Sequence, residues 1–104
     1  MQKKNISFQY LHRDEGNYKI FGEVIFENNK GLTPQQAEEI LRKKLIDSEF
    51  FYPSENQISR FPEHSGNLYF SDWYEFQRFS LTHENATDPR SLSTFLSQFS
   101  SLQS

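Results

Sequence analysis

Three consecutive side chains, His12, Arg13 and Asp14, combine the groups that acid–base catalysis uses. An imidazole changes charge near neutral pH, a carboxylate accepts a proton, and a guanidinium holds an anion. The same order of residues occurs in protein-kinase catalytic loops, but this chain lacks the accompanying glycine-rich loop and Asp-Phe-Gly motif. We therefore expect the end of a polar strand entering a turn, with a functional polar cluster of these three residues as the alternative.

One carboxylate lies within the most aromatic stretch of the sequence. Glu75 alternates with Trp73 and Phe79, so we expect it to be exposed at the end of that strand face or specially paired. If Glu75 instead met His12 in one concave pocket, the chain would be a small enzyme or a small-ligand-binding domain.

Aromatic rings are a second source of candidate sites, because Tyr and Trp often dominate the binding energy of protein interfaces. The chain has 11 Phe, 5 Tyr and 1 Trp among 104 residues. The candidate binding surface consists of Phe51, Tyr52, Tyr69, Trp73, Tyr74 and Glu75. The alternative is that residues 50–52 pack in the core or form a lid over it.

Metal and cofactor chemistry have no signal in this sequence. The three histidines, His12, His64 and His83, are far apart, and none belongs to a metal-binding motif. The chain has no Cys, which excludes a disulfide, a thiol nucleophile and a thiolate metal site. We predict no metal, no cofactor and no enzymatic activity.

Charge and hydropathy narrow the classes of partner. Eleven Lys and Arg against fourteen Asp and Glu give a net charge of −3, which disfavours nucleic-acid binding and suits a basic protein partner. No apolar run is long enough for a signal peptide or a membrane span. These features predict a cytoplasmic protein that does not enter a membrane.

The elements that must position these residues are two hairpin strands, a later strand and two helices. Residues 5–12 and 18–27 alternate apolar and polar side chains around a turn cluster, and residues 72–82 alternate again. In residues 18–27, Phe21 and Ile25 share a face with Lys19 and Glu23, which predicts a partly covered second face. A further short strand is expected at residues 57–61, and another is expected to begin at residues 68–70.

Two start signals predict helices over residues 33–46 and 88–101. Thr33 as N-cap, Pro34 at the first helical position and Gln36 form a capping box, and Asp88-Pro89 repeats the start of that pattern. We predict a single α+β domain spanning residues 1–104. It has two layers, with a mainly antiparallel sheet of three to five strands and two helices on one face, in the order β-β-α-(β)-β-β-α.

Several segments also resemble a group of small, uncharacterised bacterial proteins. The matching pieces are residues 10–14, 17–19 and 21–24, Ser48-Glu49-Phe50-Phe51-x-Pro53, Trp73-x-Glu75-Phe76 and residues 87–91. The resemblance covers nearly the whole chain and implies a bacterial cytosolic origin and a single domain. The group has no assigned activity, so the resemblance implies no catalytic residues.

These observations predict a small protein-binding module of the immunity, antitoxin-like or anti-defence inhibitor type. Blocking a partner needs shape and charge complementarity rather than a catalytic motif. Two other hypotheses remain open. One is a self-associating domain, such as a homodimer, that uses a sheet edge or the last helix. The other is a small-ligand-binding domain or enzyme that uses His12, Arg13, Asp14 and Glu75.

Overall fold

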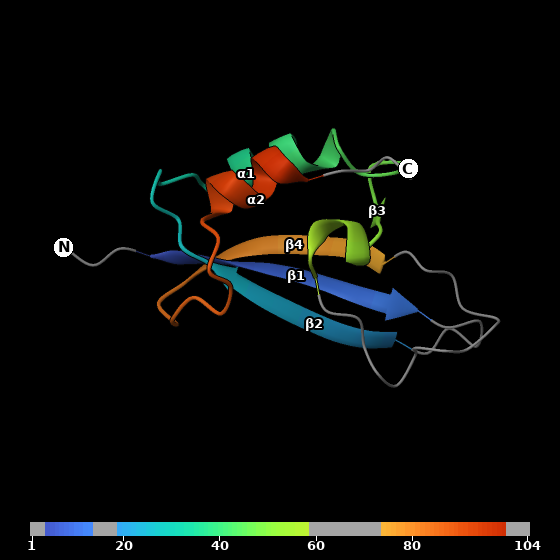
Figure 1. Cartoon of the computed structure of the whole chain (residues 1–104), viewed down its shortest axis with the longest axis horizontal. Helices are drawn as coiled ribbons and strands as arrows, with labels where there is room; N and C mark the ends of the chain where they lie inside the picture. Colours follow the sequence, from blue (N-terminus) through green and yellow to red (C-terminus); the bar gives the residue numbers. More distant parts are fainter. Residues whose placement is uncertain (1–3, 14–18, 59–73, 100–104) are drawn as a thin grey trace.

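A four-stranded antiparallel sheet forms one layer of the molecule and two helices form the other (Figure 1). The computed structural model describes residues 4–13, 19–58 and 74–99. The elements follow in the order β1 (Asn5–Arg13), β2 (Lys19–Phe26), α1 (Pro34–Arg42), β3 (Phe50–Phe51), the 3₁₀ turn η1 (Ser54–Asn56), β4 (Tyr74–Thr82) and α2 (Leu92–Gln98). This arrangement confirms the predicted α+β fold.

The strands lie in the order β2-β1-β4-β3. The hairpin of β1 and β2 pairs Ile6 with Phe26 and continues without interruption to Arg13 and Lys19. The third strand of the sheet comes from far along the chain, since Asn5 pairs with Thr82 of β4. Of the two edges, β2 forms one over its whole length, whereas β3 covers β4 only at Tyr74 and Glu75.

A bulge in β4 changes which side chains face the helices. Tyr10 pairs with Phe76 while Gln9 pairs with Arg78, so Gln77 is the additional residue. Phe76 and Phe79 are therefore both buried in the core, although they are three residues apart. The simple alternation that placed Phe79 on the face of Glu75 was wrong for this reason.

The first helix begins where the capping signals predict. Thr33 accepts a hydrogen bond from the Gln36 backbone N–H, and the Gln36 side chain accepts one from the Thr33 N–H. Ala37 and Leu41 are its buried residues. The regular helix ends at Arg42 rather than at residue 46.

The second helix begins later than the sequence predicts. Ser91, not Asp88, is the N-cap and accepts a hydrogen bond from the Thr94 N–H. Asp88 instead binds the side chain of Arg90, and the helix ends at Gln98 rather than at residue 101. Within the described residues, neither helix is long and apolar enough to cross a membrane.

The core lies between the sheet and the helices, and Phe8 is at its centre. Its ring centroid is 5.2 Å from that of Phe95 on α2 and 5.6 Å from that of Phe51 on β3. Other rings within 6.5 Å of Phe8 are those of Tyr10, Phe26, Phe76 and Phe79. These aromatic rings therefore join α2 to all four strands, and α1 adds the aliphatic side chains of Ala37 and Leu41 to the same core.

The extra strand of the sheet does not form at residues 57–61, where the sequence predicts it. Residues 57 and 58 are not in a strand, and residues 59–61, like the strand start expected at residues 68–70, are outside the described residues. The additional strand is β3, because the Phe76 N–H donates to the Glu49 carbonyl and draws the chain against the start of β4.

Candidate functional site

His12 and Arg13 do not form one polar cluster. Adjacent residues of a strand point to opposite faces of the sheet, and His12 is buried on the helix side, where its ring centroid lies 4.6 Å from that of Tyr74. Arg13 is exposed on the outer side. The expectation that His12 lies in a polar strand end was therefore wrong, and Asp14 lies outside the described residues.

Arg13 pairs across the sheet with Glu75. Its Nε atom donates to Glu75 Oε2 over 2.9 Å, and its Nη2 atom donates to Oε1 over 3.2 Å. The hydrogen bond that Arg13 donates to Glu75 raises the pKa of the Arg13 guanidinium, and the charge of the carboxylate adds to this effect. Glu75 is thus the paired carboxylate that the sequence suggested, on the outer face of the sheet.

The residues of the candidate aromatic surface are divided between the core and its margin. Phe51 and Tyr74 are buried at 0% and 1% exposure, so these two rings belong to the core and do not line an exposed surface. Tyr52 is half-buried. Tyr69 and Trp73 lie outside the described residues.

Hydrogen bonds between side chains cross the outer face of the sheet. Ser7 donates to Glu23 on β2, and Gln9 donates to Ser7 and to Ser80 on β4. Arg78 completes the chain by donating from Nε to Gln9 Oε1 over 2.9 Å. These bonds hold the polar side chains of three strands in fixed positions.

An exposed aromatic ring lies beside this polar network. The side chain of Phe21, on β2, is 59% exposed, which makes it the most exposed large apolar residue that the structure describes. It borders a shallow hollow of about 450 Å³ that is lined by Gln9, Phe21, Gly22, Glu23, Gln77 and Arg78. The partial cover expected for this face is present at Ile25, which is buried, and absent at Phe21.

The described part of the chain also leaves the backbone of β2 uncovered beside Phe21. The outward-facing groups of β2 can be identified at Ile25, whose carbonyl accepts hydrogen bonds from the N–H groups of Thr87 and Asp88. Outward-facing groups recur at every second residue of an edge strand, so those of Lys19, Phe21 and Glu23 also point away from the sheet. Among the described residues, no hydrogen bond covers these three positions. We call residues 19–23 the open half of the β2 edge.

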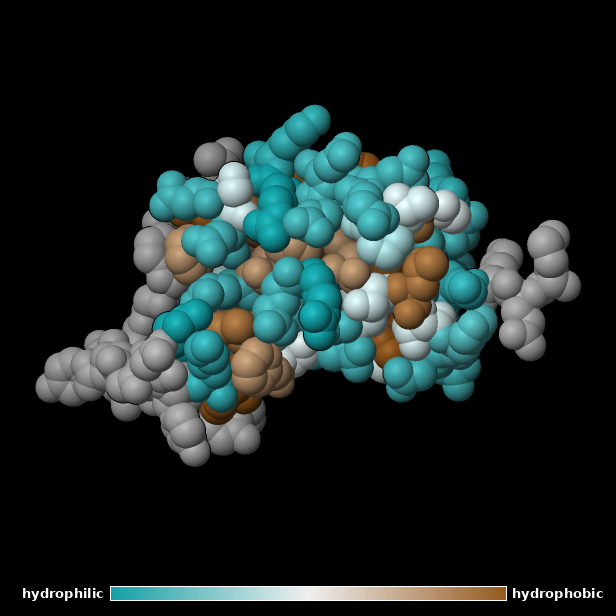
Figure 2. Space-filling view, turned by 180° about the vertical axis from the view of Figure 1, so that it is seen from behind, coloured by the Kyte–Doolittle hydropathy of each residue, from teal (hydrophilic) through white to brown (hydrophobic). Residues whose placement is uncertain are grey.

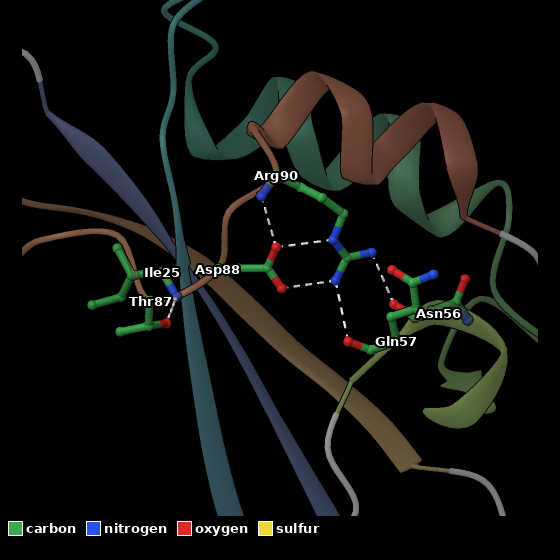
Figure 3. A network of polar contacts seen from close by, with 6 residues as sticks. All are labelled: Ile25, Asn56, Gln57, Thr87, Asp88 and Arg90. Carbon is green, nitrogen blue, oxygen red and sulfur yellow. Dashed lines mark hydrogen bonds and ion pairs between the residues drawn. The ribbon is translucent and has the colours of Figure 1, made fainter.

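The other half of the edge is covered by residues 87–92. Besides the bonds to the Ile25 carbonyl, the Ile25 N–H donates to Thr87 Oγ1 over 2.9 Å, and the Leu92 N–H donates to the carbonyl of Glu27. We call residues 25–27 the closed half of the edge. Figure 3 shows how this segment is fixed by Asp88 and Arg90.

Arg90 joins three parts of the chain. Its guanidinium binds both carboxylate oxygens of Asp88 and donates to the carbonyls of Asn56 and Gln57. It also lies over the rings of Phe26 and Phe95, at 5.6 and 5.1 Å from their centroids. All these contacts are internal, so Arg90 is a structural residue that fixes the cover of the closed half.

The electrostatics of this cluster follow from its geometry. Hydrogen bonds from Arg90 hold the pKa of the Asp88 carboxyl below its ordinary value, and partial burial opposes them. In the core, burial raises the pKa of the Tyr10 hydroxyl, with a smaller contribution from Tyr74. Across residues 4–13, 19–58 and 74–99, no three His, Asp or Glu side chains are close enough together to hold a metal ion.

Comparisons with known proteins identify no family for this chain. No protein-family model, curated protein or solved structure matches it.

Sequence reasoning missed Phe21 and Arg90 as important residues. The signal for Phe21 was its place between Lys19 and Glu23 on one strand face, since two flanking charges are typical of a face that reaches solvent. The signal for Arg90 was weaker, because an Arg two residues after an N-cap candidate does not reveal that it captures that residue's carboxylate.

Proposed function

We propose that this chain is a small protein-binding module that acts by shape and charge complementarity through the open half of the β2 edge. The observation that carries the proposal is the exposure of Phe21 beside backbone groups that no described residue covers. An exposed edge strand is a template for a strand of another protein. β2 lies at the margin of the sheet, on the side away from both helices (Figure 1).

The two kinds of contact at this edge have different roles. Main-chain hydrogen bonds supply affinity for any extended segment, whereas side chains on alternate residues select the partner. Phe21 offers the large ring that interface hot spots favour, and the hollow beside it offers room for a partner side chain. On the face drawn in Figure 2, apolar groups lie in several places between hydrophilic ones.

The partner and its biology remain as the sequence suggested them. A net charge of −3 favours a basic protein partner, and inhibition by occlusion, as in immunity or antitoxin-like proteins of the cytoplasm, requires no catalytic group. The alternative of an enzyme or ligand-binding site at His12 and Arg13 is less favoured, because these side chains lie on opposite faces of the sheet.

The test is capture of partners from host lysate by the tagged chain and its Phe21→Ser variant. Leu81→Ser is the matched control, because Leu81 is another exposed apolar residue, at 43% exposure, but lies on β4. We expect a stoichiometric partner that the wild type and the Leu81 variant retain and the Phe21 variant loses. Circular dichroism establishes that each variant is folded.

Two outcomes would contradict the proposal. Equal capture by the Phe21 variant would show that the β2 edge is not the contact surface. Absence of any stoichiometric partner, with the chain itself counted as a possible partner, would remove the protein-binding function.

A further inference from the structure

We infer that the open half of the β2 edge pairs with the same segment of a second copy of this chain, antiparallel and about a twofold axis at Phe21. The inference rests on the proposed function, because it names what occupies that surface when no other protein is bound. It is carried by the order of side chains along residues 19–23, which is complementary to itself in this register.

The backbone allows this pairing. Lys19, Phe21 and Glu23 direct their N–H and carbonyl groups outward, as the bonds at Ile25 establish for this strand. In a twofold antiparallel pair centred on Phe21, each of these residues exchanges main-chain hydrogen bonds with its counterpart in the other copy. Phe21 then lies opposite Phe21, and Lys19 lies opposite Glu23.

Charge selects this register over its neighbours. The pair places Lys19 of each copy directly opposite Glu23 of the other, and such cross-strand pairs of opposite charge are favourable. A shift by two residues places one of these charges opposite Phe21 instead. A parallel pair in register brings Lys19 beside Lys19 and Glu23 beside Glu23, which is unfavourable.

The apolar side chains are also complementary in this arrangement. On the outer face, the exposed ring of Phe21 meets its counterpart in the other copy, and aromatic pairs stabilise adjacent strands. On the helix-facing side, half-buried Ile20 lies opposite Gly22, which has no side chain to obstruct it. A large residue thus meets a small one twice in each dimer.

The closed half of the edge limits the assembly to two copies. Residues 87–92 occupy the outward groups of Ile25 and Glu27, so the partner strand cannot extend past Glu23 along this edge. A twofold interface uses the same surface of both copies and therefore closes on itself. The paired segment is short, so we expect a weak dimer that forms at high concentration.

The test is the mass of the chain by sedimentation or light scattering from about 10 µM to 1 mM, a range that covers weak association. We expect the mass to rise from 12.4 kDa towards twice that value. Lys19→Glu and Glu23→Lys each place like charges opposite one another, and each should weaken the dimer by about tenfold. An equimolar mixture of the two variants restores opposite charges at both contacts and should recover the wild-type association.

A control separates charge from the fold of the strand. Glu23 accepts a hydrogen bond from Ser7, so Ser7→Ala removes that bond without changing any charge at the edge. The Ser7 variant should associate as the wild type does. If it becomes monomeric while folded, the effect of the Glu23 variant comes from the lost Ser7 contact, and only Lys19→Glu bears on the charge pairing.

The outcomes distinguish this inference from the proposed function. If the wild-type chain stays monomeric at about 1 mM, the inference that a second copy pairs with this edge is overturned. If Phe21-dependent capture of a different protein persists, the protein-binding function stands. A dimer that ignores both charge changes overturns the register, and loss of both dimerisation and Phe21-dependent capture overturns both proposals.

Discussion

The two halves of the β2 edge have the same extended backbone, but one half is covered by another segment and the other is not. At residues 25–27, a returning segment supplies hydrogen bonds to the outward groups, and Arg90 fixes that segment through Asp88. At residues 19–23, no described residue supplies such bonds, and the exposed side chains are Lys19, Phe21 and Glu23. Whether the outward backbone groups of β2 are covered therefore depends on the segment after β4 rather than on the sequence of β2 itself.

The comparison also shows two ways to protect a sheet edge. The closed half is protected by a loop, which prevents any strand from pairing there. The open half carries charges of both signs around a single ring, and charged side chains on an edge discourage indiscriminate pairing. Only a strand with matching charges fits the second kind of edge, so the open half combines protection with selectivity.

The largest expected difference is between the two phenylalanines of β2. Phe26 is buried at 0% exposure on the closed half's strand segment, so Phe26→Ala should lower the free energy of unfolding by about 3–5 kcal/mol. Phe21→Ala should change it by less than about 0.5 kcal/mol, because that ring is exposed. Urea unfolding of both variants measures the difference, and equal losses would mean that Phe21 is part of the folded core.

The next largest effect is expected at Arg90. Arg90→Ala removes the bonds to Asp88 and two carbonyls and leaves the carboxylate without its partner, which should cost about 3 kcal/mol. Arg78→Ala is the control, because exposed Arg78 makes one hydrogen bond to Gln9 on the outer face, and it should cost less than about 1 kcal/mol. A small effect at Arg90 would show that the closed half does not depend on this residue.

Acid should weaken the closed half selectively. The pKa of Asp88 is lower in the folded protein than its ordinary value of 3.8. Its contribution to stability is therefore complete above that value and is lost as the pH falls through the lower, folded pKa. When unfolding is measured between neutral pH and about pH 2, the free energy of unfolding of Asp88→Asn should fall less with decreasing pH than that of the wild type. Parallel profiles would contradict this assignment.

The smallest expected effect is at the bond that covers Ile25. Thr87→Val keeps the shape of the side chain but removes the hydroxyl that accepts from the Ile25 N–H, which should cost about 1 kcal/mol. Amide hydrogen exchange at Ile25 should accelerate in this variant, and exchange at Phe21 in the monomer should stay unchanged. Acceleration at both positions would mean that the two halves of the edge open together.

Most of the fold was accessible from the sequence because local signals and burial agree there. The hairpin, the late strand and the Thr33 capping box formed as predicted. The errors have specific causes. The Asp88 carboxylate binds Arg90, so Ser91 begins the second helix, and one additional residue at Gln77 changes the phase of β4. Neither event is encoded in side-chain periodicity.

The candidate site was less accessible than the fold. His12 and Arg13 are neighbours in sequence, yet a strand places them on opposite faces. Ile25 and Phe21 share one face of β2, yet Ile25 is buried and Phe21 is exposed. Such differences depend on which distant segment packs over a strand, and a single sequence does not predict which segment that is.

The place of β1 in the sheet has a consequence for the order in which the protein folds. Its hairpin partner β2 is close in sequence, but its other neighbour, β4, begins more than 60 residues after β1 ends. Contacts of such long range slow folding, because the intervening chain loses entropy before they form. During synthesis, the hairpin can form while the rings around Phe8 still await those of Phe79 and Phe95. The nascent chain is therefore exposed to aggregation until α2 has emerged from the ribosome.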